Sequence, residues 1–282
     1  MIINRSILKK VYRKRDSWSH KYDFGHLLVI GGSKQYTGSP ALVALSALAA
    51  LRSGVDLVTI VAPERAANIA ASFSPNLIAY PLKGDYLNKK HLPELLKFSK
   101  NKTAVVIGNG LGREKETLKT IIRYLKNISM PAVIDADAIH AVALDKKIVR
   151  NKKFIITPHS REFEVLSGSK ITTNLNERIK SVKNAASELK TTILLKGHVD
   201  VISDGKKVAL NKSGSPYMTK GGMGDTLAGI CGALLARDVD TFTAACASAY
   251  INWKAGEIAS KKLGEGTTAT DLINSITEVI KY

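Results

Sequence analysis

The chain has 282 residues, 45% of them hydrophobic, which is enough for a substantial core. Its 42 Lys and Arg against 24 Asp and Glu give a net charge of +18. The basic residues are dispersed and only 6% of the residues are aromatic, so we expect no nucleic-acid partner. A basic surface serves equally well to attract polyphosphate substrates. The most apolar run, residues 41–51, is too short to cross a bilayer, so no membrane association is expected either.

The N-terminal residues are basic and include no apolar segment typical of a secretory signal. Cys231 and Cys246 both lie in apolar helical patterns, which predicts reduced core residues in a cytoplasmic protein. No linker, low-complexity block or repeat interrupts the chain. We therefore expect an N-terminal arm over residues 1–24, irregular or helical, and a single domain over residues 25–282.

Short apolar strands alternate with helical segments along the chain. Strands are expected at residues 26–30, 56–61, 77–80, 104–107, 132–134, 154–156 and 192–195, followed by a hairpin of residues 199–203 and 208–210. Helices are expected at residues 40–52, from 63 onward, at 89–98, 117–125 and 176–189, and as three consecutive helices from the glycine-rich loop to the C-terminus. This alternation predicts an α/β fold with a mostly parallel sheet covered on both faces.

Five polar or glycine-rich loops follow predicted strands. They are Gly31-Gly32-Ser33, Gly108-Asn109-Gly110, Asp135-Ala136-Asp137, Thr157-Pro158-His159 and Lys196-Gly197. In an open parallel sheet such loops meet at the carboxyl edge, where ligands bind. The sequence therefore predicts a ligand-binding cleft at this edge.

The stretch from Met218 to Gly229 carries Gly221, Gly222 and Gly224, followed at once by Asp225 and an apolar helical run. Glycines allow successive N–H groups to converge on one anion, and a helix N-terminus adds its positive dipole end. Asp225 in the first turn is then a candidate base toward an attacking hydroxyl. Taken alone, the stretch fits equally well an ordinary turn in which Asp225 caps a helix.

Other polar residues allow two interpretations each. His159 either contacts a substrate or lies on the surface, and Glu162 is either catalytic or stabilises the start of a helix. Asp135 and Asp137 either organise magnesium near phosphates or cap the following helix, with capping favoured for Asp137. Lys196 either approaches a phosphate or is an exposed strand-end lysine. Complete dinucleotide and P-loop fingerprints are missing, and no histidines have the spacing of a transition-metal site.

Seven segments in order resemble the NAD(P)H-hydrate dehydratases of the ribokinase-like superfamily, over roughly residues 25 to 275. They are residues 28–33 with Tyr36-Thr37-Gly38, residues 51–58, 107–112, 134–138, 157–159, 194–197 and 221–225. The resemblance implies a three-layer α/β/α sandwich. It also implies a lyase that repairs NADHX and NADPHX with ADP or ATP as phosphoryl donor, Mg²⁺ at the nucleotide phosphates, and a homotetramer or larger homo-oligomer. NAD(P)H-hydrate epimerase is expected as a separate protein.

The resemblance also implies roles for particular residues. Asp225 would be the catalytic base and would contact the hydrate. The hydrate would further touch Ser39, Gly110 and His159. The nucleotide and its phosphates would be bound by Lys196, Gly197, His198, Val199, Asp200, Gly221, Gly222, Met223 and Gly224.

Several positions depart from the family's usual pattern. Asn109 replaces the proline of Gly-Pro-Gly, Ser39 an alanine, Arg161 a glycine, and Met223 a threonine or serine. These changes place in question the side-chain contacts at Ser39 and Arg161, while Asp225 is retained.

Three alternatives stay open. The chain could be a ribokinase-like kinase of a sugar or vitamin alcohol, using the same glycine loop and Asp225. It could also be a nucleotide-binding regulator without turnover, or a basic nucleic-acid binder. No identified residue reads the last phosphate of the nucleotide, so the choice between ADP and ATP is open, as is that between NADHX and NADPHX.

Overall fold

The computed structural model describes residues 1–35 and 38–281, so Tyr36 and Thr37 of the first segment that carries the family resemblance lie outside the described residues. Nine strands of the described chain form one sheet in the order β3-β2-β1-β4-β5-β6-β7-β8-β9. The strands are β1 (His26–Ile30), β2 (Leu57–Pro63), β3 (Ile78–Leu82), β4 (Ala104–Ile107), β5 (Ala132–Ile134), β6 (Phe154–Ile156), β7 (Thr192–Leu195), β8 (Asp200–Ser203) and β9 (Val208–Asn211). Strands β1 to β7 pair in parallel, and β7, β8 and β9 pair antiparallel. The predicted mostly parallel sheet with a final hairpin is confirmed.

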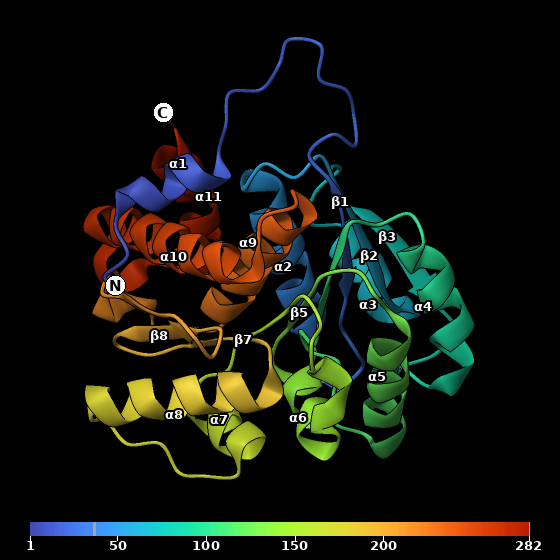
Figure 1. Ribbon diagram of the computed structural model, residues 1–282. Helices are drawn as coiled ribbons and strands as arrows, with labels where there is room; N and C mark the ends of the chain where they lie inside the picture. The colour runs from blue at the N-terminus through green and yellow to red at the C-terminus, as the bar shows by residue number, and fades with distance from the viewer. Residues whose placement is uncertain (36–37, 282) are drawn as a thin grey trace.

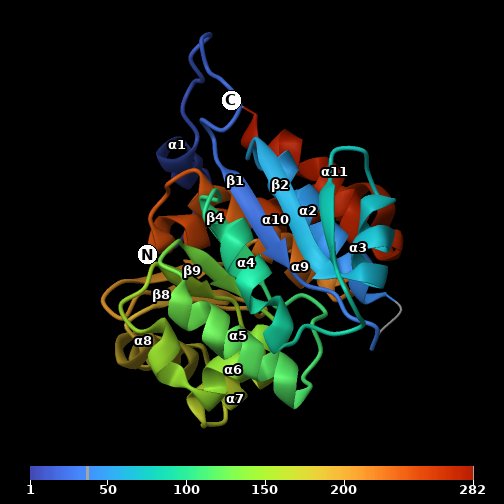
Figure 2. The ribbon, with the colours of Figure 1, turned by 90° about the vertical axis from the view of Figure 1, so that its right-hand side faces the viewer.

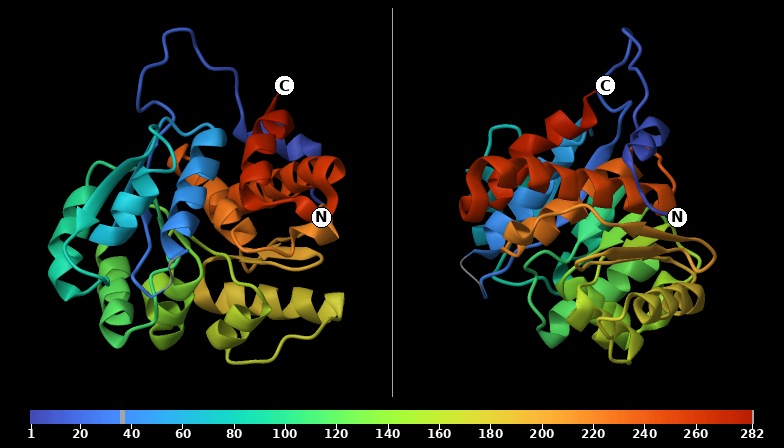
Figure 3. Two further views of the ribbon diagram at one scale, coloured as in Figure 1. Left: turned by 180° about the vertical axis from the view of Figure 1, so that it is seen from behind. Right: turned by 90° about the vertical axis from the view of Figure 1, so that its left-hand side faces the viewer.

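Helices cover both faces of this sheet, as the views in Figures 1 and 3 show. One layer holds α2 (Ser39–Arg52), α3 (Glu64–Ala71), α9 (Met223–Ala236), α10 (Thr241–Leu263) and α11 (Ala269–Ile280). The other layer holds α4 (Leu92–Ser99), α5 (Lys115–Asn127), α6 (Asp137–Leu144), α7 (Ser160–Ser167) and α8 (Leu175–Leu189). Short 3₁₀ helices lie at Arg5–Ile7, Lys89–His91, Lys146–Val149, Pro216–Met218 and Gly264–Gly266. The expected three-layer α/β/α sandwich is confirmed.

Each strand contributes side chains to two separate cores, because successive residues of a strand point to opposite faces. In β1, Leu27 and Val29 join the core under α2 and α9, whereas Leu28 and Ile30 join the core under α5 and α6. All four side chains are fully buried. Burial on both faces explains why the strands read in the sequence as continuous apolar runs.

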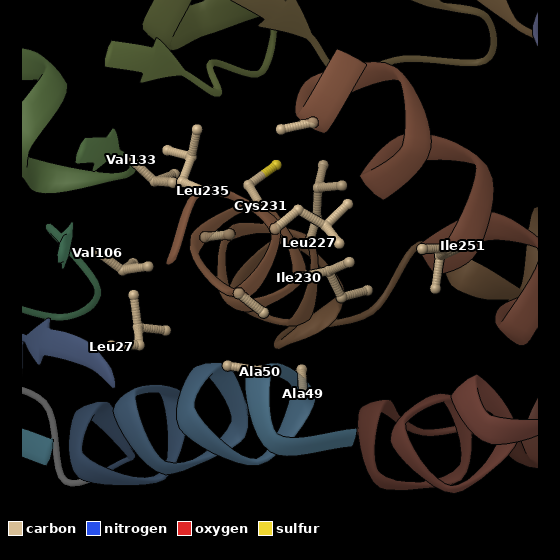
Figure 4. Close-up of a cluster of buried hydrophobic side chains, with 14 of the residues drawn as sticks. Leu27, Ala49, Ala50, Val106, Val133, Leu227, Ile230, Cys231, Leu235 and Ile251 are labelled. Carbon is tan, nitrogen blue, oxygen red and sulfur yellow. The ribbon is translucent and has the colours of Figure 1, made fainter. Parts of the chain in front are cut away.

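Helix α9 is packed against the sheet and against α2 at two glycines. A Cβ atom at Gly232 would lie 2.4 Å from Cγ2 of Val106, and one at Gly229 would lie 2.0 Å from the carbonyl oxygen of Ser46. Figure 4 shows α9 surrounded by side chains from strands, from α2 and from α10, among them Leu27 and Ile251. This close packing fixes the helix whose N-terminus carries the glycine-rich loop.

The N-terminal residues run along the edge of the sheet. The Ile3 amide donates to the Leu210 carbonyl at 2.9 Å, and Leu8 of α1 (Leu8–Val11) is buried. Residues 12–25 then form a loop that projects beyond the sheet (Figure 2), and Trp18 on it is 82% exposed. Within the described ranges, no helix combines the length and the apolar character needed to cross a membrane.

Candidate functional site

The glycine-rich loop leads into the N-terminus of α9. Gly222 is the N-cap residue and has a φ of +91°, in the left-handed region that favours glycine. A Cβ at Gly222 would also lie 2.9 Å from Ala269 and from Leu45. The first N–H groups of a helix have no acceptor within the helix, so those of the first turn are available to an anion. Asp225 lies in this same turn, as predicted.

Asp225 is held by an amide side chain from another loop. Nδ2 of Asn109 donates to Oδ1 of Asp225 at 2.6 Å. Burial, reinforced by the charge of Asp135, raises the pKa of Asp225 to about 7, while the Asn109 hydrogen bond and the charge of Lys196 oppose the rise. A carboxyl group with a pKa close to neutrality is suited to accept a proton near neutral pH.

Asp135, at the carboxyl end of β5, is the centre of a buried polar network. Its Oδ1 accepts from the hydroxyl of Thr157 at 2.8 Å and lies 3.0 Å from Nζ of Lys196. Its Oδ2 accepts from Nδ2 of Asn109 at 3.3 Å. Nζ of Lys196 also lies 3.8 Å from Oε2 of Glu162. The loops after β4, β5, β6 and β7 therefore meet, as the sequence predicts for the carboxyl edge.

Lys196 carries its charge between two carboxylates. Its side chain is 14% exposed, and those of Asp135 and Glu162 are 3% and 8% exposed. Burial acts against the ammonium charge, but the two carboxylates outweigh it and raise the pKa of Lys196. Lys196 thus brings a stable positive charge to the site, beside Asp225.

His159 and Glu162 form a reciprocal cap at the start of α7. The Glu162 amide donates to Nδ1 of His159 at 3.2 Å, and the His159 amide donates to Oε2 of Glu162 at 2.9 Å. The prediction that Glu162 stabilises a helix start is confirmed. Burial and the nearby Lys196 charge lower the pKa of His159, so its ring is neutral at pH 7. Its side chain is 52% exposed and remains available to a ligand.

The interpretation of Asp137 as a helix cap is wrong. Asp137 is the first residue of α6, and Ala136 is its N-cap without a side-chain hydrogen bond. The Asp137 carboxylate instead accepts from the Gly112 amide at 2.9 Å and from Nε of Arg113 at 2.8 Å. The Asp137 carboxylate thereby holds the loop after β4. The N–H and guanidinium donors of this loop are stronger hydrogen-bond partners than the amides at an exposed helix end.

Two residues predicted to touch the hydrate lie in contact with each other. Ser39 is 1% exposed, and its hydroxyl donates to the Ser33 carbonyl at 3.0 Å and accepts from the Ser33 amide at 3.2 Å. Gly110 has a φ of +62°, and a Cβ there would lie 2.5 Å from Cβ of Ser39. The Gly32 amide donates to the Asn109 carbonyl at 2.7 Å. The structure thus uses Ser39 to join the loops after β1 and β4, and its hydroxyl is committed within the protein.

The residues predicted to bind the nucleotide fall into two groups. Residues 221–224 lie at the start of α9, and residues 196–200 run from the end of β7 into the first residue of β8. Gly197 and His198 line a cavity of about 470 Å³, together with residues 212–216, Met218, Thr219 and Trp253. Asp200 is buried, with 1% of its surface exposed, and it does not line this cavity. Its carboxylate accepts a hydrogen bond from the Gly197 amide at 3.0 Å. Burial raises the pKa of Asp200 to about 6 against three hydrogen bonds that lower it.

Several residues of the site were not found by sequence reasoning. Asn211 and Trp253 both donate to Oδ2 of Asp200, and Arg178 donates to the Lys196 carbonyl at 3.3 Å. The sequence places Asn109 in a carboxyl-edge loop but assigns its side chain no role, whereas the structure shows that this side chain joins Asp135 and Asp225. Its position between two glycines at a strand end was the available signal. Trp253 lies in the middle of α10, where no local pattern marks it.

No group of three or more His, Cys, Asp or Glu side chains within residues 1–35 and 38–281 is placed to hold a metal ion. Together, an ionisable carboxyl, a helix N-terminus and a buried ammonium group can support transfer of a phosphoryl group to a hydroxyl.

Comparison with known proteins agrees with this geometry. Residues 27–278 match the family described as NAD(P)H-hydrate dehydratase. A bifunctional NAD(P)H-hydrate repair enzyme of Pyrobaculum aerophilum is 43% identical over 265 residues, which are 93% of this chain and 52% of that protein. An ADP-dependent (S)-NAD(P)H-hydrate dehydratase of Nitrosopumilus maritimus is 38% identical over 281 residues, 99% of this chain and 96% of that protein.

The fold is also that of solved structures. An ADP/ATP-dependent NAD(P)H-hydrate dehydratase of Bacillus subtilis, crystallised with ATP and Mg²⁺, superposes with a TM-score of 0.81 at 23% identity, over 98% of this chain and 96% of that one. A ribokinase-like superfamily protein of Enterococcus faecalis superposes with a TM-score of 0.83 at 24% identity, over 99% of this chain and 94% of that one, so the sheet and its two helix layers share the ribokinase-like fold. The chain spans about half the length of the bifunctional relatives it matches.

Proposed function

The chain belongs to the NAD(P)H-hydrate dehydratase family, and on that basis we propose that it converts NADHX and NADPHX to NADH and NADPH, with ADP as phosphoryl donor. The single observation that carries this proposal is the position of Asp225. It lies in the first turn of α9, beside the glycine loop, with a pKa raised to about 7 by burial and by Asp135. A base is thereby placed where a phosphoryl group would bind.

The proposed reaction has two stages. Asp225 accepts the proton of the C6 hydroxyl, and that oxygen attacks the terminal phosphorus of ADP, so that the P–O bond to AMP breaks. The C6–O bond of the resulting phosphate ester then breaks as the ring nitrogen donates its lone pair, phosphate leaves, and a proton is lost from C5 to restore the double bond. The products are the reduced nicotinamide, AMP and phosphate.

The residues around Asp225 would each support one part of this reaction. The N–H groups of Gly222, Met223 and Gly224 would bind the transferring phosphoryl, with Gly221 giving the loop its turn. Lys196 would add positive charge at the same place. Such preorganised stabilisation is worth about 3 kcal/mol per lost donor in comparable sites.

The other predicted site residues would contact the hydrate or the nucleotide. His159 is exposed beside the network and supports a contact with the hydrate. Gly110 and Ser39 would shape the same pocket through backbone and packing. Gly197, His198 and Val199 would hold the nucleotide at the 470 Å³ cavity. Asp200 would fix their loop by accepting a hydrogen bond from the Gly197 amide.

Mg²⁺ would be carried by the nucleotide phosphates and would neutralise their charge. ADP is proposed over ATP because the relative matched over nearly its full length is ADP-dependent. We further propose one domain over residues 25–282 with an arm over 1–24, a homotetramer or larger assembly, and an NAD(P)H-hydrate epimerase as functional partner. A cytoplasmic location is supported by the free, buried Cys231 and Cys246.

The test is the absorbance of the reduced nicotinamide ring during incubation with NADHX, magnesium and either ADP or ATP. We expect recovery of NADH with stoichiometric phosphate, and AMP when ADP is the donor. The Asp225→Asn variant should lose about 10²- to 10⁴-fold in rate, the usual contribution of a general base. Lack of turnover with both nucleotides would reject the dehydratase proposal and direct attention to alcohols as kinase substrates.

A further inference from the structure

Asn109 joins two carboxylates from different parts of the chain. It is fully buried, and its Nδ2 atom donates at 2.6 Å to Oδ1 of Asp225 and at 3.3 Å to Oδ2 of Asp135. An amide nitrogen has two N–H groups, so one can serve each carboxylate. The side chain therefore links the base to the buried network around Asp135.

The other end of the same side chain is left without a partner. Oδ1 of Asn109 is buried and has no hydrogen bond to any described residue. If the amide were flipped, its oxygen would face the carboxylate oxygens of Asp135 and Asp225, and its nitrogen would take the place of the unpartnered oxygen. Neither amide atom would then have a hydrogen-bond partner. An unsatisfied buried acceptor has a cost, so the orientation is set by the two acids.

We propose that Asn109 is a positioning residue, which fixes the carboxylate of Asp225 toward the bound hydroxyl and keeps it ionised. This inference rests on the proposed function, since it assigns Asp225 the role of base. The charged groups facing Asp225 are Asp135 from the loop after β5 and Lys196 from the loop after β7. Glu162 of α7 acts on this arrangement through Lys196. Asp135 raises the pKa of Asp225, and Asn109 and Lys196 lower it.

The first experiment compares the pH dependence of turnover in the wild type and in Asn109→Leu, which keeps the number and branching of the side-chain heavy atoms but has no donor. Because loss of the donor disfavours the carboxylate, the ascending limb of kcat should move to higher pH by about one unit. At neutral pH, kcat should fall about 10-fold, because the smaller ionised fraction adds to the lost orientation of the carboxylate. KM for both substrates should change less than about twofold, and the variant should recover part of its rate at high pH.

Thr117→Val is the matched control, because it also replaces a buried polar side chain by an apolar one of equal shape. Its hydroxyl donates to the Leu87 carbonyl at 2.8 Å, away from the site. Its pH profile should follow the wild type. Asn109→Ala lacks the donor without adding bulk, and it must show the same shift of the limb if the leucine variant is unstable. A uniform loss of rate at every pH in both variants would overturn the proposal.

A second readout does not depend on catalysis. The shift in unfolding temperature caused by Asn109→Leu is measured with Asp225 present and in an Asp225→Asn background, at pH 5 and at pH 8. We expect Asn109→Leu to lower the unfolding temperature most at pH 8 with Asp225 present, because the carboxylate is then ionised. Equal losses in both backgrounds would overturn the proposal even if the enzyme is active. If the wild type has no dehydratase activity, this cycle still decides whether Asn109 and Asp225 are coupled.

Discussion

Nζ of Lys196 lies 3.0 Å from Oδ1 of Asp135, and the pair is almost enclosed by protein. Removing one partner of such a pair leaves an uncompensated buried charge, which typically costs about 3 to 5 kcal/mol. Lys196→Met should therefore lower the free energy of unfolding by about 3 kcal/mol at pH 7, in addition to reducing activity. Denaturant unfolding measures this loss.

Lys262→Met provides the control for the lysine substitution. Lys262 pairs with Glu278 at 3.1 Å, but the two side chains are 64% and 49% exposed. Exposed pairs contribute about 1 kcal/mol or less, so little change is expected. Equal effects of the two substitutions would contradict the buried role of Lys196.

Asp225 should make the protein less stable as the pH rises through neutrality. Its pKa is about 7 in the folded state against an ordinary value of 3.8, so the folded state binds the proton more tightly. The stabilisation from this proton is complete below pH 4 and disappears as the pH approaches 7. Asp225→Asn should thus be more stable than the wild type above pH 7. Since Asp225 is partly exposed to solvent, the gain should be about 1 to 2 kcal/mol.

Thermal unfolding of both proteins between pH 4 and pH 9 measures this difference. The difference in unfolding temperature between the two proteins should increase with pH and then level off above the pKa of Asp225 in the folded state. A constant difference across the range would show that Asp225 does not titrate near neutrality.

The same pKa predicts that kcat rises with pH toward a plateau above about 7, as for a base that must be ionised.

Trp253 should report nucleotide binding. Its ring lines the cavity beside Gly197, and its Nε1 donates to Asp200, which fixes the loop. Trp253→Phe should raise KM for ADP about tenfold while changing kcat little, because it removes a hydrogen bond to a charged group that positions the loop. Titration of ADP monitored by tryptophan fluorescence provides the direct measurement.

Trp18→Phe is the matched control, since Trp18 is the other tryptophan and is 82% exposed on the projecting loop. A fluorescence change with ADP should persist in Trp18→Phe and vanish in Trp253→Phe. The reverse pattern would place the nucleotide away from the predicted cavity.

Gly229→Ala should be strongly destabilising. The added Cβ would lie 2.0 Å from the carbonyl oxygen of Ser46, a backbone atom in the middle of α2. Overpacking of this kind costs about 1 to 3 kcal/mol or more. Gly266→Ala is the control, because nothing lies within 4 Å of a Cβ there. Similar unfolding midpoints for the two variants would show that α2 and α9 can separate without cost.

Most of the fold could be predicted from the sequence, because local periodicity and glycine positions are strong signals. The strand at residues 26–30 is found as predicted, and the expected helix over 40–52 begins one residue earlier, at Ser39. The convergence of loops followed from the general behaviour of parallel sheets. Asp225 was identified in the correct turn because a glycine cluster and a helix start are both local features.

The partners of the site residues could not be predicted in the same way. Asp137 precedes a helix, which favours a cap, but a guanidinium group and an N–H from another loop compete for it. Asn109 and Trp253 reach carboxylates 116 and 53 residues away in the chain. Such pairings depend on how strands are ordered in the sheet, which single-chain patterns do not specify.

The close packing of α9 at Gly229 and Gly232 also determines how the enzyme can respond to its ligands. Asp225 is attached to a helix that has little room to slide or rotate, so ligand-induced movement at this site would have to come from the surrounding loops. Closure around the reactants would fall to the loops over residues 197–200 and 212–219. In hydrogen exchange we expect the amides of α9 to be among the slowest of the chain and those of these loops to slow on nucleotide binding.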